Sequence, residues 1–211
     1  MERNRSVLAR LGGMPRKREP AGAAVLQESV TSAIAAAMFD ELAETGYARM
    51  SVDAVARRAG VGKAAVYRRW PSKQAMLLDL LGAAVRRNVP EVPDSGSLAG
   101  DVRGFLDVIV AQVAEPRIKR IALDMAAETE RSPELGAALR EAVGGPRRAA
   151  ADAVLRRGIE RGELPADTDR ELGLDLLISP LLGRLLLTGG PVDDAYLTRL
   201  TAVIVAGLTS A

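Results

Sequence analysis

The 211-residue chain contains no cysteine and no histidine. It can therefore form no disulfide, offers no thiol nucleophile, and lacks both the commonest metal ligand and the commonest general base. These absences exclude most zinc sites and most hydrolytic triads. We expect no metal, no cofactor and no catalytic residue. An enzyme that uses the carboxylates of a helical body stays an alternative, and it requires two or more acids that converge in a buried pocket.

Aromatic residues are scarce, at 3% of the chain, and no run of alternating apolar and polar residues persists. Both features argue against β-strands. Apolar residues instead recur at helical spacing almost throughout, which predicts an all-α fold of about nine helices. No apolar stretch approaches the length of about 18 residues that a membrane-spanning helix requires. The first residues also lack the apolar core of a secretory signal, which favours a cytoplasmic protein.

Clusters of glycine and proline divide the chain into three parts. Residues 1–24 mix six arginines and lysines with glycine and proline. We interpret them as a flexible basic arm, which either enters a minor groove or only aids solubility. Residues 25–90 are expected to form one helical domain, and residues 91–211 a second one. Within the second domain, a helix is expected to be interrupted at Gly144, Gly145 and Pro146.

Positive charge is concentrated in the first part of the chain. Residues 1–90 contain 15 lysines and arginines and 8 acids, whereas residues 91–211 contain 14 and 19. The overall net charge of +2 therefore combines a basic region with an acidic one. Such a basic region is typical of proteins that bind a polyanion. Nucleic acid is favoured over a membrane surface, because no polybasic helix with a bulky apolar face accompanies the charge.

Residues 51–73, SVDAVARRAGVGKAAVYRRWPSK, have the pattern of two short helices joined by a tight turn. The Ser51 hydroxyl can cap the first helix, and the Ser72 hydroxyl can cap the helix that follows the segment. Gly60 stands where a chain that leaves a helix often needs a positive φ. One apolar stripe of the first helix is expected to face a core; it comprises Val52, Val55, Ala56 and Ala59.

The second helix of this segment is expected to present a basic outer face. Val66 and Trp70 stand four residues apart and face inward, which leaves an outer face of Lys63, Ala64, Tyr67 and Arg68. B-DNA has a major groove about 12 Å wide that admits such a helix. The segment therefore predicts a helix-turn-helix, and a solvated helical hairpin with exposed arginines is the alternative.

The segment resembles the DNA-binding region of the tetracycline-repressor (TetR) family of transcriptional regulators. The matching residues, in order along the chain, are Phe39, Gly46, Tyr47, Ser51, Ala59, Gly60, Val61, Tyr67, Ser72 and Lys73. The chain departs from the family pattern at three positions. Gly62 stands where serine is common, Arg69 where histidine is usual, and Trp70 where phenylalanine is usual.

The resemblance implies a role for each matching position. Val52, Lys63 and Ala64, and in part Tyr67, would lie near base edges. The phosphate backbone would lie near Ser51, Ala65, Tyr67, Arg69 and Lys73. Arg68 is added from its outward position alone, and it is expected to reach either a guanine or a phosphate.

The last two expected helices carry more apolar surface than one small helical layer can bury. One face is lined by Leu172, Leu176, Pro180, Gly183 and Leu187. The other is lined by Leu197, Leu200, Ile204 and Leu208. We expect these faces to form a two-fold, four-helix dimer interface, as is usual in the family that the chain resembles. Burial inside one subunit is the alternative.

The resemblance also implies a small-molecule effector that binds the body and releases DNA. The candidate pocket residues are Leu106, Val110, Met125, Leu177 and Leu181, with Arg184 as a polar contact. Ordinary core packing is the alternative, because apolar residues at helical spacing usually pack together. The expected function is a homodimeric repressor of transcription that binds an inverted-repeat operator in double-stranded DNA. A helical interaction module whose basic head docks an acidic protein is the alternative.

Overall fold

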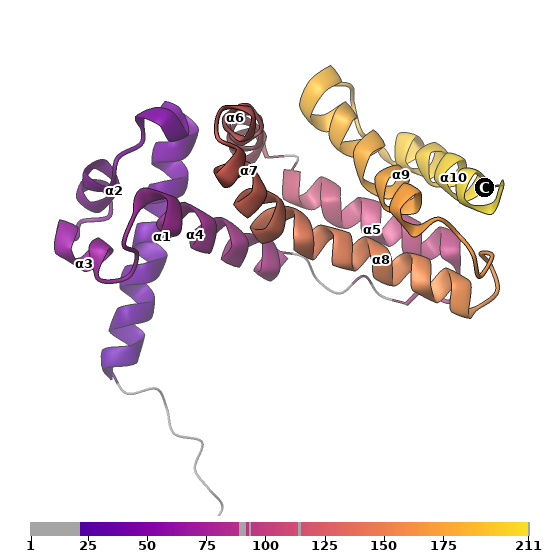
Figure 1. The fold of residues 1–211 in the computed structure, drawn as a ribbon, viewed down its shortest axis with the longest axis horizontal. Helices are drawn as coiled ribbons and strands as arrows, with labels where there is room; N and C mark the ends of the chain where they lie inside the picture. Colours follow the sequence, from indigo (N-terminus) through magenta and orange to yellow (C-terminus); the bar gives the residue numbers. More distant parts are fainter. Residues whose placement is uncertain (1–21, 89–91, 93, 114, 211) are drawn as a thin grey trace, which may run out of the picture.

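The computed structural model describes residues 22–88, 92, 94–113 and 115–210 (Figure 1). Nine helical segments account for the regular structure of these residues, and no strand occurs among them. The expected all-α fold is therefore confirmed. The first segment is kinked at Gly46, whose φ of 76° and ψ of 163° are not helical. The basic arm predicted at residues 1–24 lies almost wholly outside the described residues. Within the described ranges, every helix is too short or too polar to span a membrane.

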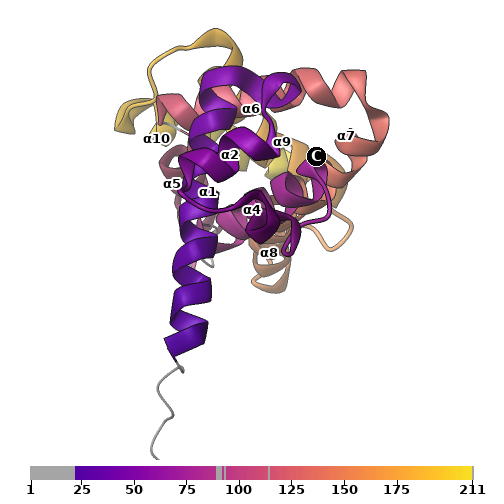
Figure 2. The same ribbon diagram turned by 90° about the vertical axis from the view of Figure 1, so that its left-hand side faces the viewer.

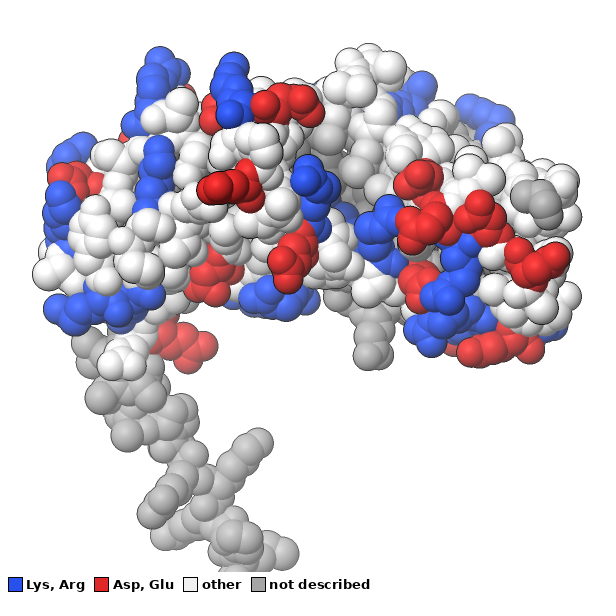
Figure 3. Space-filling view, in the orientation of Figure 1, with Lys and Arg blue, Asp and Glu red and all other residues white. Residues whose placement is uncertain are grey.

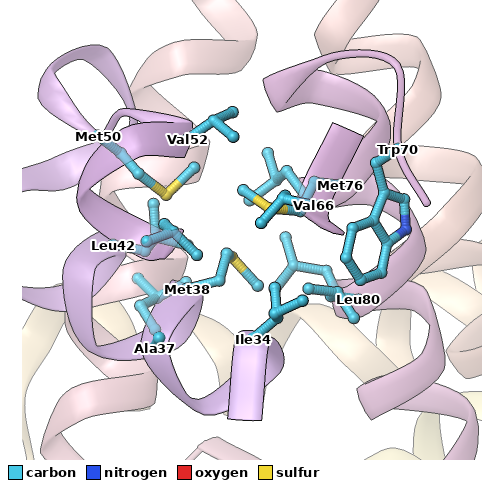
Figure 4. Close-up of a cluster of buried hydrophobic side chains, with 14 of the residues drawn as sticks. Ile34, Ala37, Met38, Leu42, Met50, Val52, Val66, Trp70, Met76 and Leu80 are labelled. Atoms are coloured by element: carbon cyan, nitrogen blue, oxygen red, sulfur yellow. The ribbon is translucent and has the colours of Figure 1, made fainter. Parts of the chain in front are cut away.

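The first four helices form a head around one apolar cluster. They are α1 (Gly22–Arg49), α2 (Val52–Arg58), α3 (Lys63–Tyr67) and α4 (Lys73–Asn88). Helix α2 packs against the C-terminal half of the long α1 (Figure 2). Side chains from all four helices and their connections meet in the head cluster (Figure 4). Its members include Ile34, Met38, Leu42, Met50, Val66, Trp70, Met76 and Leu80.

The remaining helices form the body. They are α5 (Leu98–Val113), α6 (Pro116–Arg131), α7 (Pro133–Leu139), η1 (Arg140–Gly144), α8 (Gly145–Glu160), α9 (Arg170–Leu182), η2 (Gly183–Thr188) and α10 (Asp194–Ser210). Helix α5 packs against α8, α9 and α10. The body cluster that these four helices enclose includes Val102, Phe105, Ile109, Val154, Leu155 and Leu177.

The head and body share apolar packing. Ile121 and Met125 of α6 and Leu135 and Leu139 of α7 belong to the head cluster, although the chain reaches them only after α5. The expected boundary near residue 90 therefore divides the chain between head and body, but the apolar core of the head includes side chains from both sides of this boundary. As a result, the head rests on α6 and α7 rather than hanging from α4 alone (Figure 1).

The interruption expected at Gly144, Gly145 and Pro146 is wrong. Residues 133–160 stay helical throughout, and both glycines have right-handed helical dihedrals. Five residues form one π-helical stretch, in which the N–H of Gly145 donates to the carbonyl of Arg140. The wider π turn relocates the backbone hydrogen bonds just where Pro146 has no N–H to donate, so the proline does not end the helix.

A buried carboxylate holds the start of the body together. Asp101 of α5 is fully buried and accepts hydrogen bonds from the N–H and the hydroxyl of Ser95, each 2.8 Å long. Arg157 Nε of α8 and Nη2 of Arg161, the residue that follows α8, each donate to its Oδ2 at 3.0 Å. Burial on its own raises the pKa of Asp101, but the bonds from Ser95, Arg161 and Arg157 outweigh it and the pKa is lowered. The carboxylate thereby ties the connection before α5 to α8.

We expect Asp101→Asn to lower the free energy of unfolding by about 3 kcal/mol at pH 7, because it leaves Arg157 and Arg161 without their buried counter-charge. The contribution of Asp101 is present above the carboxyl pKa of the unfolded chain, about 3.9, and is lost as pH falls through the lowered folded-state pKa. Urea unfolding of both proteins at pH 7 and at acidic pH measures this. Equal stability of the two proteins at pH 7 would contradict the assignment.

Candidate nucleic-acid interface

Local capping builds the helix-turn-helix as the sequence predicts. The N–H of Ala54 donates to the Ser51 hydroxyl at 3.1 Å, and the N–H of Ala75 donates to the Ser72 hydroxyl at 3.0 Å. Gly60 has a φ of 68°, which turns the chain between α2 and α3. Gly62 precedes α3 in an extended conformation and provides no side-chain cap. The expected cap residues and the turn glycine are thus confirmed.

Helix α3 separates an inner face from an outer face. Val66 and Trp70 are buried in the head cluster, and the Trp70 indole N–H donates to Asp79 Oδ2 at 2.8 Å. The outer face is exposed; it comprises Lys63, Ala64, Tyr67 and Arg68. Tyr67 keeps 45% of its surface exposed. Lysines and arginines gather at this end of the molecule, whereas acids and bases mix over the body (Figure 3).

Val52 does not reach the outer surface. Its side chain is only 7% exposed and points into the head cluster (Figure 4). The expectation that Val52 lies near base edges therefore conflicts with its place in the apolar stripe of α2. Ser51, which is exposed, marks the outer edge of this helix instead.

Lys63 forms an ion pair within the expected interface. Its Nζ lies 2.7 Å from Asp53 Oδ1 and 3.0 Å from Oδ2, and 5.7 Å from the centre of the Tyr67 ring. The hydrogen bond from Lys63 to Asp53 raises the pKa of the lysine. Both partners are more than half exposed, so water screens the pair and its contribution to stability is small. Its main effect is to orient the lysine beside α3.

Arg69 is held between two helices. Its Nε donates to Thr31 Oγ1 of α1 at 3.2 Å, and its Nη1 donates to the carbonyl of Ala65 at 2.9 Å. The side chain is half-buried. These bonds fix the guanidinium at the edge of α3 with part of its donor capacity unused.

Lys73 is held at the junction of head and body. Its Nζ donates to the carbonyl of Tyr47 at 2.8 Å and lies 4.2 Å from the centre of the Tyr47 ring. The N–H of Tyr47 donates to Asp124 Oδ2 of α6 at 2.7 Å. Gly46 has a φ of 76°, and a Cβ there would lie 2.7 Å from Asp124 Oδ1. Only glycine therefore lets α6 approach this close, and Lys73 is linked through Tyr47 to the body.

The structure separates the residues of the expected dimer interface. Leu197, Ile204 and Leu208 are buried in the body cluster, where α10 packs on α5, so this part of the interface is wrong. The exposed members are on α9 and η2, with Leu172 49% and Leu187 79% exposed. Leu176, Gly183 and Leu200 are half-buried, and Pro180 is exposed.

The structure also divides the expected pocket residues. Leu106, Leu177 and Leu181 are fully buried in the body cluster and Val110 packs against it, whereas Met125 belongs to the head cluster. Arg184 lies 4.1 Å from the centre of the Tyr196 ring and donates from Nε to the carbonyl of Pro191. Met125 is therefore not part of a shared wall with the other four.

Sequence reasoning missed the groups that position the basic side chains. Asp53 orients Lys63, Thr31 holds Arg69, and Asp124 supports Tyr47. Asp53 is the single acid among seven basic residues in 45–73, which is a signal for it. No comparable signal marks Thr31 or Asp124, because both are far away in the chain. Among the described residues, no group of three acids could hold a metal ion.

Two family models match the chain. The model of bacterial regulatory proteins of the tetR family matches residues 34–80, and the tetracyclin repressor-like C-terminal domain matches residues 92–204. The chain is 34% identical over 175 residues to the DNA-binding transcriptional repressor TetR of Mycobacteroides abscessus, covering 82% of this chain and 90% of that protein. It is 32% identical over 173 residues to the uncharacterized HTH-type transcriptional regulator YdeS of Bacillus subtilis, covering 82% and 86%.

Solved structures share the fold. The TetR family transcription regulator SCO0332 is 30% identical, with a TM-score of 0.66 over 85% of this chain and 98% of that one. The regulator FadR of Bacillus subtilis, solved in complex with stearoyl-CoA, is 18% identical, with a TM-score of 0.69 over 85% and 97%. All four of these proteins are described as transcriptional regulators.

We expect Asp53→Asn to strengthen binding to random-sequence duplex DNA several-fold at low salt. The substitution removes a negative charge beside the phosphates and frees Lys63 for them, so the slope of log affinity against log salt steepens by about 0.9. Fluorescence anisotropy over a salt series measures both. Asp167→Asn removes an exposed acid of the loop before α9 and serves as the control. The same affinity and slope for Asp53→Asn and the control would refute the expectation.

Proposed function

Because the chain belongs to the TetR family of transcriptional regulators, we propose that it is a cytoplasmic repressor that leaves a palindromic operator when a small molecule binds its body. Members of this family are regulators and not enzymes, as the sequence led us to expect. The outer face of α3 carries the proposal, because small and basic residues stand there on a helix that packing of Val66 in the head cluster holds in place.

The interface supports a division between base and phosphate contacts. Lys63, Ala64, Tyr67 and Arg68 share the outer face of α3 and are the candidates for base edges. Ser51, Ala65, Arg69 and Lys73 border that face and are the candidates for phosphates. The proposed phosphate lysine, Lys73, is anchored to Tyr47, so it would present its remaining donors in a fixed place.

An effector site in the body is the second part of the proposal. FadR of Bacillus subtilis, whose fold this chain shares, was solved with stearoyl-CoA bound. In this chain α6 contacts both α1 in the head and η2 in the body, so a ligand beside α6 would act on both. Such a ligand releases DNA only if it binds better to the conformation in which the two heads no longer fit the operator.

A homodimer would build on the exposed apolar face of α9, η2 and α10. Leu172 and Leu187 are exposed on the first two elements, and Val203 is 69% exposed on the last. A Cβ at Gly207 would lie 3.8 Å from Leu176 Cδ1, so the exposed sides of α9 and α10 are continuous. Two heads related by a two-fold axis would match an inverted repeat.

Selection of the purified protein on random duplex DNA tests the proposed function. An enriched inverted repeat, bound with a steep salt dependence, is the expected result. Weak binding without enrichment would favour the alternative, a basic head that docks an acidic protein surface.

On the selected operator, we expect Lys63→Ala to reduce the discrimination between operator and random DNA, because base contacts specify sequence. Lys73→Ala should weaken binding to both DNAs by a similar factor, because phosphate contacts position the protein without reading it. Competition titrations at fixed salt measure the two ratios. Parallel losses from both substitutions would show that Lys63 does not read bases.

We expect Val203→Glu to make the protein monomeric at micromolar concentration, because it places a charge in the middle of the proposed apolar contact. Light scattering after size exclusion measures the mass. Leu123→Glu alters an exposed leucine of α6, outside this face, and should leave the dimer intact. If the Val203→Glu protein is still a dimer, the dimer interface does not include this face.

A further inference from the structure

One arginine of α8 stands on the core-facing side of its helix. Arg147 lies four residues before Ala151 and seven before Val154, and both of these residues are fully buried. Residues at this spacing share one face of a helix. The neighbouring Arg148 points the other way and pairs with Glu171 and Asp175 of α9. The side chain of Arg147 instead reaches α5, where its Nε donates to Gln112 Oε1 at 3.2 Å.

The charge of Arg147 has no counter-charge. Within the described part of the chain, no carboxylate oxygen lies within 4.0 Å of its nitrogens, and its hydrogen-bond partner is a neutral amide. Three other half-buried arginines of the body, Arg103, Arg157 and Arg161, each contact at least one acid. Arg184 instead lies over the Tyr196 ring. Burial lowers the pKa of Arg147, because surroundings poor in water disfavour the charged form. An unpaired guanidinium in such a place costs stability.

The free end of Arg147 is accessible. Its two terminal nitrogens, Nη1 and Nη2, make no hydrogen bond in the described structure. They are nevertheless in contact with solvent, because the one side-chain nitrogen there that is both unpartnered and fully buried is Arg157 Nη2. Nη1 and Nη2 of Arg147 are therefore within reach of a small molecule. A guanidinium presents its donors as a planar fork, which matches a carboxylate with two parallel hydrogen bonds.

The surroundings of Arg147 are mixed in character. Val143 of η1 stands four residues before Arg147 and packs at the edge of the head cluster. A Cβ on Gly144 or Gly145 would meet nothing within 4 Å, so there is open space beside the turn that leads into Arg147. The molecular surface is hollowed between α6 and α9, above the first turns of α8 (Figure 3). π-Helical stretches such as η1 are frequent at functional sites.

We propose that Arg147 and Gln112 form the anion-recognising end of the effector site, and that the effector is a small amphipathic carboxylate. This inference rests on the proposed function. The carboxylate would take the two free nitrogens of Arg147, and Gln112 holds the guanidinium toward it. The apolar part of the effector would lie against the margin of the head cluster, beside Val143.

The position of this site suits a switch. Helix α8 is continuous with η1, and η1 contacts α4 of the head. A Cβ on Gly82 of α4 would lie 3.4 Å from the carbonyl oxygen of Ala142, so these elements pack with little space between them. A ligand that pulls the first turn of α8 toward α5 would therefore displace η1 against α4, which follows the helix-turn-helix.

The first test needs no ligand. Arg147→Met keeps a long side chain and removes the unpaired charge, so we expect the melting temperature of the full-length protein to rise by about 2–4 °C. Arg148→Met removes a paired, outward arginine and is expected to leave the melting temperature unchanged or lower it. A lower melting temperature for Arg147→Met than for wild type would mean that Arg147 is a structural residue, and would overturn the proposal.

The second test uses matched acids and amides. Hexanoate, decanoate and benzoate are each compared with their neutral primary amides in thermal unfolding at constant ionic strength. At least one acid should raise the melting temperature of wild type and of Arg148→Met, while its amide does not, and Arg147→Met should lose that rise. Equal effects of acid and amide, a rise retained in Arg147→Met, or no rise with any acid would each overturn the proposal.

The two proposals can fail separately. Thermal unfolding requires no DNA, so a stabilising acid whose effect depends on Arg147 would establish the site even if no operator is selected. If an operator is selected, the same acid should release it from wild type but not from Arg147→Met. If an operator is selected but no acid raises the melting temperature, the proposed regulatory function stands and the proposed carboxylate site is refuted.

Discussion

The head of this protein completes its apolar core with side chains from the body. Ile121 and Met125 of α6 and Leu135 and Leu139 of α7 are part of the cluster that supports the helix-turn-helix. Helices α2 and α3 have seven and five residues, which is too short for stability in isolation. Their geometry therefore depends on this shared packing. Since close-packed interiors adjust little, a shift of α6 would reach the head directly.

Polar contacts also join the head to α6 of the body. Asp124 accepts the N–H of Tyr47, and Gly46 leaves the space that this approach requires. Arg117 of α6 also pairs with Asp40 of α1 at 2.7 Å. The two contacts are on the same helix pair as the apolar packing, so α1 and α6 behave as one unit. Movement within the protein is then to be sought between this unit and the rest of the body.

Features that depend on neighbouring residues could be predicted from the sequence. The caps at Ser51 and Ser72, the positive φ of Gly60 and the two faces of α3 follow from local spacing, and the structure confirms them. The all-α fold, the family and the absence of enzyme function are confirmed as well.

Features that depend on which helix packs against which could not be predicted. The spacing of apolar residues in α10 predicts a dimer surface, but Ile204 packs in the body cluster within the subunit. Its apolar character does not distinguish Met125 from the body residues, and only the fold shows that α6 turns it toward the head. Arg147 has a core-facing spacing with Ala151, yet spacing alone does not reveal that no acid comes near it.

Two basic side chains beside α3 are ordered before any DNA arrives. Thr31 holds Arg69, and the carbonyl of Tyr47 holds Lys73. A free lysine or arginine side chain loses about 2 kcal/mol of conformational entropy when it is immobilised. Here much of that entropy is lost during folding, so binding to a phosphate backbone costs less side-chain conformational entropy. The same restraint makes the surface less able to adapt its reach to a DNA of different shape.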